Sequence, residues 1–325
     1  MFRKEKPISI KGSTSSLCNN LSVMTNAEKG LLSYAVVHKS IVNIIQASTD
    51  GSSVTGKQLV YKEPTTSHGN PFVFQAKWIE LPQRTVLVLT SQRGIQIFDG
   101  DGSTMIYWHA LSDEPDRSCF GRGITDMGDN LICIGTEGGH ILIFNIPPKG
   151  TNVCLLDVLK GSHPCAICDL ASEKNILVSS DDQGNIAVWK FLGQQFHLVH
   201  KIAGGGAPCT SVSIWKDVVV GAYGTGHIRV YDATSGRIGA EVTAHARCIN
   251  SLHVAKKSGL LLSVSDDSFF RIWQLKEGSL PQIQHKYQEI VEDLQLVGGS
   301  FVDSQGRALC LTGYDNSEIH FYVQN

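Results

Sequence analysis

Two cysteines, Cys165 and Cys168, have the spacing found in half of a zinc site. A structural zinc ion needs four ligands, and no second close pair in the chain completes the set. Both residues fall on an expected innermost strand with their side chains on opposite faces. This arrangement favours two core thiols over a metal or redox site, which stays the alternative.

Three consecutive glycines, Gly204-Gly205-Gly206, could let a backbone approach a phosphate. A phosphate-binding loop needs a following helix and, in P-loop proteins, a Lys-Ser/Thr pair. Here Ala207-Pro208-Cys209 and another strand pattern follow instead. The glycines therefore predict a tight loop between strands, and a ligand approach is the alternative.

The twelve histidines also invite metal or acid–base chemistry. None lies in a His-Glu-x-x-His pattern, and the chain contains no Gly-x-Ser-x-Gly nucleophile elbow. We therefore expect no enzyme, no catalytic residue, no bound metal and no cofactor.

The elements that position these residues follow from a five-residue block that recurs six times, with aromatic-to-aromatic steps of 46, 45, 42, 42 and 49 residues. A period in this range with four strands per unit is typical of a propeller blade. Each unit reads as strands a to d, from the innermost to the outermost, with a polar turn between b and c. The blocks are Ile95–Asp99, Ile141–Asn145, Ile186–Lys190, Ile228–Asp232, Phe270–Gln274 and Ile319–Val323.

A seventh unit precedes these six, with Ile45 in place of the aromatic residue. The last unit lacks strand d, and the alternating segment at residues 6–11 can supply it, which closes the ring and leaves no open edge. Residues 287–296 read as an irregular connection. The prediction is one all-β, seven-bladed propeller over 1–325, with blades at about 17–62, 72–110, 122–160, 161–203, 205–243, 244–287 and 290–325 plus 5–12.

In two units an Asp precedes a tight turn, a Trp ends the strand that follows, and a His lies upstream: His163, Asp182 and Trp189, and His245, Asp267 and Trp273. These units resemble the WD-repeat family, in which a histidine, a strand-b hydroxyl, a turn aspartate and a tryptophan form a hydrogen-bonded chain inside a blade. A buried aspartate and histidine are tolerable only when paired. The Trp-Asp pair itself is absent. Five short strings carry a narrower resemblance to one branch of the family: Asn19–Val23, Ser91–Gln96, Tyr107–Leu111, Ala244–Arg247 and Thr312–Asp315. The implied networks are His163, Ser179, Asp182 and Trp189, and His245, Ser263, Asp267 and Trp273.

Composition excludes several function classes. Hydrophobic residues make up 42% and charged residues 18%, and the net charge of −2 gives no basic field for nucleic acid. No run approaches the ~20 apolar residues of a membrane span. Without a signal-peptide pattern, we expect nine reduced cysteines and a cytoplasmic protein, including one on vesicles, but not a secreted one. The oligomeric state is left open between a monomer and weak self-association.

In a propeller the b–c turns and d–a connections share one face, here called the loop face, which is where variable residues bind partners. Tyrosine and arginine are frequent binding hot spots. Trp108, on an expected strand d, is a further candidate at the outer edge, with packing against a neighbouring blade as the alternative. The loop-face candidates are Arg93, Arg122, Glu137, Tyr223, Arg247, Asp266 and Tyr314.

The function that fits best is a non-catalytic scaffold or adaptor that binds proteins or peptides in signalling or trafficking. One alternative is a ubiquitin-ligase substrate receptor, but the Trp-Asp-x-Arg motif of such receptors is missing, since lysine follows Trp189 and glutamine follows Trp273. The other is a phosphoinositide-binding propeller. Of its paired-arginine motif this chain has only a single arginine, in Gln92-Arg93-Gly94.

Overall fold

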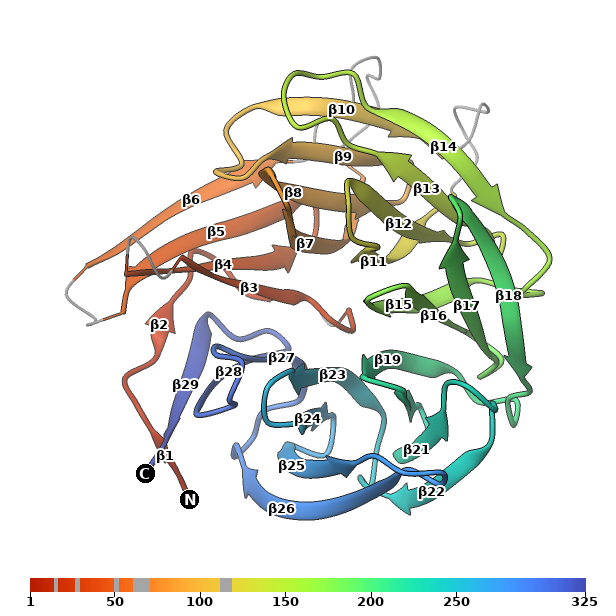
Figure 1. The fold of residues 1–325 in the computed structure, drawn as a ribbon. Coiled ribbons are helices and arrows are strands. Elements are labelled where there is room, and N and C mark those ends of the chain that lie inside the picture. Colours follow the sequence, from red (N-terminus) through yellow and green to blue (C-terminus); the bar gives the residue numbers. More distant parts are fainter. Residues whose placement is uncertain (15–16, 27–29, 50–52, 61–70, 112–118) are drawn as a thin grey trace.

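The computed structural model describes residues 1–325 except 15–16, 27–29, 50–52, 61–70 and 112–118. Seven antiparallel sheets stand around a central axis as the blades of a propeller (Figure 1). The described residues contain strands and turns and no helix. The prediction of an all-β, seven-bladed propeller is confirmed.

The blades follow one another along the chain. Blade 1 contains β3 (Leu21–Asn26), β4 (Leu31–His38), β5 (Ile41–Ser48) and β6 (Val54–Val60). Blade 2 contains β7 (Val73–Leu81), β8 (Arg84–Ser91), β9 (Gly94–Asp99) and β10 (Met105–Ala110). Blade 3 contains β11 (Gly121–Asp126), β12 (Leu131–Thr136), β13 (Ile141–Asn145) and β14 (Cys154–Leu159). Blade 4 contains β15 (Ile167–Glu173), β16 (Ile176–Asp181), β17 (Ile186–Leu192) and β18 (Gln195–Ile202).

The remaining three blades complete the ring. Blade 5 contains β19 (Cys209–Trp215), β20 (Val218–Tyr223), β21 (His227–Asp232) and β22 (Ile238–Thr243). Blade 6 contains β23 (Ile249–Ala255), β24 (Leu260–Ser265), β25 (Phe269–Lys276) and β26 (Gln282–Ile290). Blade 7 contains β27 (Leu296–Phe301), β28 (Ala308–Gly313) and β29 (Glu318–Gln324), with β1 (Phe2–Lys4) and β2 (Ile8–Ser9) from the N-terminus.

The first strand of each blade lies innermost. Contacts run from β3 to β7, β11, β15, β19, β23 and β27 in turn, and β27 returns to β3. These seven strands therefore form the wall of the central channel.

The hydrophobic core lies between neighbouring blades. Every residue of β12 is buried, whereas exposed and half-buried residues alternate through much of the outer strand β18. One core cluster joins Cys133 and Ile143 of blade 3 to Leu177 and Trp189 of blade 4. A middle strand is covered on both faces, which explains its almost continuous apolar sequence.

The N-terminus closes the ring as predicted, because β1 and β2 both pair with β29. The two chain ends lie side by side (Figure 1). Pairing begins at Phe2, before the expected residues 6–11, and Glu5 N donates to Phe321 O at 2.8 Å. Pro7 has no N–H to donate, and the edge strand is interrupted around it.

The prediction for residues 287–296 is correct only in part. Strand β26 continues to Ile290, opposite Phe269, and the irregular connection is limited to residues 291–295. The Tyr287 ring packs between Phe2 and Phe270, with centroids 5.4 and 6.0 Å away. This aromatic packing holds the end of β26 in the blade.

The glycine triplet forms the connection between β18 and β19. Gly204 N donates to Asn185 Oδ1 at 2.9 Å, and Gly206 N donates to Gln183 O at 3.1 Å. A Cβ atom on Gly204 would lie 2.3 Å from Gln183 O, so the close backbone approach requires glycine there. The glycine loop therefore contacts the turn between β16 and β17, which contains Gln183 and Asn185.

Candidate binding face and central channel

Backbone hydrogen bonds tie the b–c turns to the d–a connections and so build the loop face. Glu137 N donates to Phe120 O at 2.9 Å, Asp266 N to Cys248 O at 3.1 Å and Tyr314 N to Gln295 O at 2.8 Å. The loops on this face are consequently braced against one another. A rigid face presents its side chains at low entropic cost to a partner.

The candidate residues differ in how far they reach solvent. Glu137, Arg247 and Tyr314 are exposed, and Tyr314 exposes 50% of its surface. Arg93, Arg122 and Asp266 are half-buried. Trp108 lies on the outer strand β10, opposite Gln96 of β9, and is also half-buried.

Tyr223 is not a surface residue, and its assignment to the binding face was wrong. It is 2% exposed, and its hydroxyl lies 3.0 Å from that of Tyr231. The Arg229 guanidinium lies over its ring at 4.6 Å. Tyr223 ends β20 with its side chain in the core between blades 4 and 5, so the residue belongs to the strand and not to the turn that follows.

Two candidates meet in one hollow between blades 6 and 7. Arg247 and Asp266 line this space of about 400 Å³. Asn250 Nδ2 donates to Asp266 Oδ1 at 2.6 Å and so fixes that carboxylate. The other lining residues are Asp267, Ser268, Asp293, Leu294 and Gln295. Tyr314 bonds Gln295 through its backbone, which places the exposed aromatic residue beside this hollow.

In blade 6, hydrogen bonds join the four residues of the implied network. His245 Nδ1 lies 3.0 Å from Asp267 Oδ1, and His245 Nε2 lies 2.8 Å from Ser263 Oγ. Trp273 Nε1 donates to the same hydroxyl at 2.9 Å. Burial lowers the pKa of His245. Burial acts to raise the pKa of Asp267, but the hydrogen bond and charge of His245, together with the hydrogen bonds from the Ala246 and Phe269 backbone, outweigh burial and keep this pKa low.

In blade 4 the aspartate of the network is Asp181, and the choice of Asp182 was wrong. His163 Nδ1 lies 2.8 Å from Asp181 Oδ2, and His163 Nε2 lies 2.7 Å from Ser179 Oγ. Trp189 Nε1 donates to Ser179 Oγ at 3.4 Å. Side chains alternate along a strand, so Asp181 shares the face of Ser179. Asp182 points elsewhere and accepts from Cys168 Sγ at 2.9 Å.

The two cysteines of the Cys-x-x-Cys pair have separate environments. Cys168 is buried on β15, whereas Cys165 precedes that strand and is half-buried. Burial raises the pKa of both thiols. Within the described parts of the chain, no group of three or more His, Cys, Asp or Glu side chains is placed to hold a metal ion.

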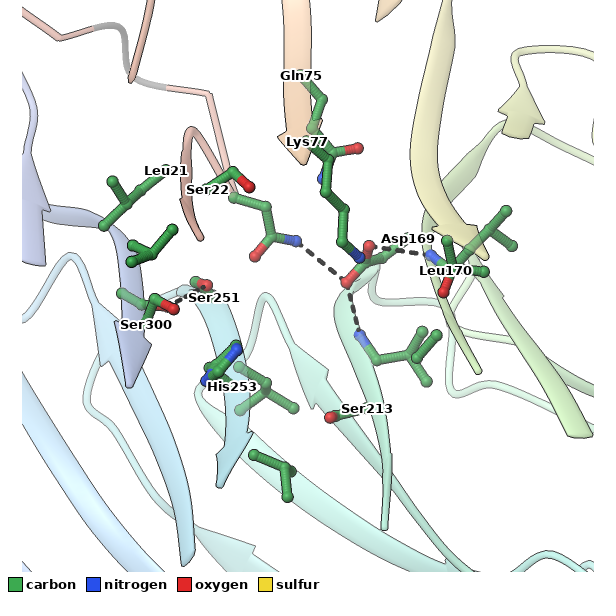
Figure 2. Close-up of a pocket in the computed structure, with 18 of the residues that line it drawn as sticks. Leu21, Ser22, Gln75, Lys77, Asp169, Leu170, Ser213, Ser251, His253 and Ser300 are labelled. Atoms are coloured by element: carbon green, nitrogen blue, oxygen red, sulfur yellow. Dashed lines mark hydrogen bonds between the residues drawn. The ribbon is translucent and has the colours of Figure 1, made fainter. Parts of the chain in front are cut away.

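The sequence analysis named no residue of the central channel as a candidate for the wall of a binding site. Polar side chains from several inner strands line the channel, among them Gln75, Lys77, Asp169, Ser251 and His253 (Figure 2). Its volume is about 320 Å³. The Lys77 side chain reaches into it toward Asp169 (Figure 2).

Asn19 lies across the channel at the loop face. Its backbone N lies 3.1 Å from Val297 O and 3.2 Å from Asn250 O. Its Nδ2 donates to Asp169 Oδ2 at 3.1 Å and to Ser211 Oγ at 3.3 Å. This residue of the segment before blade 1 therefore bonds to blades 4, 5, 6 and 7 at once.

Asp169 accepts three further hydrogen bonds. Ser211 Oγ donates at 2.8 Å, Val212 N at 3.0 Å and Leu170 N at 2.9 Å. Burial raises the pKa of this carboxyl, and nearby Lys77 opposes that change. For the Lys77 ammonium the charged form is the protonated one, so burial lowers its pKa. The Lys77 Nζ donates to Ile124 O at 2.7 Å.

Similar side-chain bridges join other pairs of blades around the channel. Ser22 Oγ accepts from Trp78 N at 3.0 Å, Gln75 Oε1 from Gly123 N at 3.0 Å and Ser211 Oγ from Leu252 N at 3.1 Å. The signal available in the sequence was a polar residue in the same part of several strands a. The alternation of each strand does not by itself show which of its residues face the ring axis.

Comparison with known proteins decides the family. A sequence model described as WDR54 matches residues 1–324. The chain belongs to the WDR54 family. WD repeat-containing protein 54 of Homo sapiens is 40% identical over 332 residues, which cover 98% of each chain. WD repeat domain 54 of Rattus norvegicus is 40% identical over 334 residues with the same coverage. Both the WD-repeat resemblance and the narrower one carried by short strings are confirmed for this WDR54 family member.

More distant likenesses show the fold alone. A chain in the crystal structure of the mitotic checkpoint complex superimposes with a TM-score of 0.76 at 16% identity, covering 99% of this chain and 96% of that one. The structure of U3-55K gives a TM-score of 0.72 at 13% identity, covering 99% and 98%. Across the described part of this WDR54 family chain, no helix has the length and apolarity to cross a membrane.

Proposed function

We propose that this WDR54 family propeller is a non-catalytic scaffold that binds a protein or peptide segment on its loop face, in cytoplasmic signalling or trafficking. The observation that carries the proposal is the hollow between blades 6 and 7. It brings Arg247 and Asp266 together from the two kinds of loop that form this face, and exposed Tyr314 stands beside it.

The chemistry of the hollow suits a polar peptide. Arg247 supplies planar hydrogen-bond donors for a carboxylate or carbonyl group. Asp266 and Asp293 supply acceptors on the same surface, and Tyr314 offers an aromatic face with a polar end. Arginine and tyrosine are among the residue types enriched at the hot spots of protein interfaces.

The test is a quantitative affinity purification from cytosol with the intact chain. A variant carrying Arg93→Glu, Arg247→Glu and Tyr314→Ala is compared with the wild type. The matched control is Lys149→Glu, an exposed charge reversal in the connection between β13 and β14, on the opposite face. All three proteins must have equal melting temperatures.

Proteins lost with the triple variant but kept with the control would support the loop face and would name the pathway. Equal eluates from all three proteins would contradict it. Cullin-complex subunits among the lost proteins would instead favour the ubiquitin-ligase alternative. Flotation with phosphoinositide liposomes, abolished by Arg93→Glu, would favour the membrane alternative.

A further inference from the structure

The central channel forms a chamber with side-chain bridges toward both ends. Asn19 crosses it on the loop face, as described above. Toward the opposite face, Lys256 of the segment after β23 reaches across to Glu173 of β15, with Nζ 2.9 Å from Oε2. A water molecule takes up about 30 Å³ of liquid, so the intervening volume of about 320 Å³ can hold a small organic molecule.

Two lysine side chains that line the chamber have N–H groups without an acceptor among the described residues. Lys77 has three N–H groups and one acceptor, Ile124 O. Lys256 donates to Glu173 and to Ile214 O at 2.6 Å, which leaves one N–H group. These donors come from blades 2 and 6 and border the same chamber.

His253 adds a neutral donor. Its Nδ1 accepts from Phe301 N at 3.1 Å, so the ring proton lies on Nε2. Burial, with Lys77 and Lys256 nearby, lowers the pKa of His253 to about 4. The imidazole therefore stays neutral at pH 7 and offers its Nε2–H without adding a charge.

Three carboxylates lie at or near the chamber, and two of them are already engaged. Asp169 accepts from Asn19, Ser211 and Val212 at Oδ2 and from Leu170 at Oδ1, so both of its oxygens already accept hydrogen bonds. Glu173 is paired with Lys256. Asp126 also lines the chamber and is the carboxylate that opposes an incoming anion.

We propose that this chamber binds a small molecule through an anionic oxygen group, a phosphate or a carboxylate, held by Lys77, His253 and Lys256. The Lys256–Glu173 pair is half exposed on the lysine side, and exposed ion pairs contribute little to stability. An anion can therefore take Lys256 from Glu173. Glu173 competes with the anion for Lys256, and Asp126 repels it, so both carboxylates weaken anion binding. The three donors bind the anion.

The experiment is a calorimetric titration of the full chain at pH 7 with inorganic phosphate and, separately, with acetate. Lys77→Met and Lys256→Gln are expected to weaken binding by about tenfold or more, the usual effect of losing one charge-assisted contact. Glu173→Gln and Asp126→Asn are expected to strengthen it several-fold. The control is Lys257→Gln, which removes an exposed lysine that does not line the chamber.

The lysine variants are expected to lower the affinity and the carboxylate variants to raise it. This difference separates binding from misfolding, because a variant that merely folds poorly cannot bind more tightly. Phosphate binding without acetate binding would assign the anion to phosphate esters, and the reverse would assign it to carboxylates. The proposal is overturned if neither anion binds with a Kd below about 10 mM. It is also overturned if Lys256→Gln and Glu173→Gln leave the affinity unchanged. Binding of an acidic peptide alone would also overturn it, since the ligand would then be a protein.

Discussion

Asn19 Nδ2 lies 3.1 Å from Asp169 Oδ2, so a residue before the first blade bonds to the innermost strand of the fourth. The Asn19 backbone has φ of +55°, in the left-handed region that asparagine tolerates better than most residues. The contact spans the channel and does not follow from the neighbouring sequence of either residue. It places the Asn19 side chain across the loop-face end of the channel.

Asn19→Ala is expected to lower the stability of the whole ring. It removes a donor to a buried carboxylate, and a hydrogen bond to a charged group contributes about 1.5–3 kcal/mol. Asn19→Asp is expected to cost more, because it places a second carboxylate against Asp169. Urea unfolding measures both, with Asn152→Ala as the exposed asparagine control. Equal midpoints for Asn19→Ala and the control would contradict the bridge.

Deletion of residues 1–12 is expected to lower the melting temperature sharply. The deletion removes β1 and β2 and leaves one edge of β29 without a partner. It also removes Phe2, which packs on Tyr287. Differential scanning calorimetry measures the change, and an unchanged melting curve would refute closure by the N-terminal strands.

Asp181→Asn and Asp182→Asn are expected to differ although the residues are neighbours. Asp181 accepts from His163, Gln183 and Asn185, so we expect a loss of about 2–3 kcal/mol. Asp182 accepts from the Cys168 thiol and is half-buried, so we expect a loss within about 0.5 kcal/mol. Denaturant midpoints compare the stabilities of the two variants. Equal losses of stability would contradict the assignment of the network to Asp181.

Stability is expected to fall as the pH drops from about 6.5 to about 4, in part because of His253. The unfolded chain protonates this histidine near pH 6.5, whereas in the fold burial keeps it neutral until about pH 4. The unfolded state therefore binds more protons in this window, and acid favours it.

The check is His253→Asn, whose amide oxygen can still accept from Phe301 N. The variant should show a smaller drop in melting temperature between pH 7 and pH 5 than the wild type. His245 and His320 also have lowered pKa values through burial, so some pH dependence remains. An equal drop in melting temperature for the variant and the wild type would mean that His253 is already protonated in the fold at pH 5.

Much of the architecture could be predicted from the sequence, since each blade is a local unit of four strands joined by short turns. The Trp273 network could also be predicted, because its histidine, serine and aspartate lie within 30 residues of the tryptophan. In the Trp189 network the turn contains two adjacent aspartates. Spacing alone did not identify which of them points inward.

The amino-acid sequence by itself determined the number of blades, the closing strand and the polar residues of the turns, because alternation and turn chemistry act between near neighbours. Tertiary structure decided that Tyr223 is buried, that Arg247 and Asp266 share a hollow, and that Asn19 meets Asp169. It also brought Lys77, His253 and Lys256 to one chamber. These relationships depend on ring closure, which brings innermost strands from distant parts of the chain around one axis. A pattern among near neighbours in the sequence cannot predict which distant residues then meet.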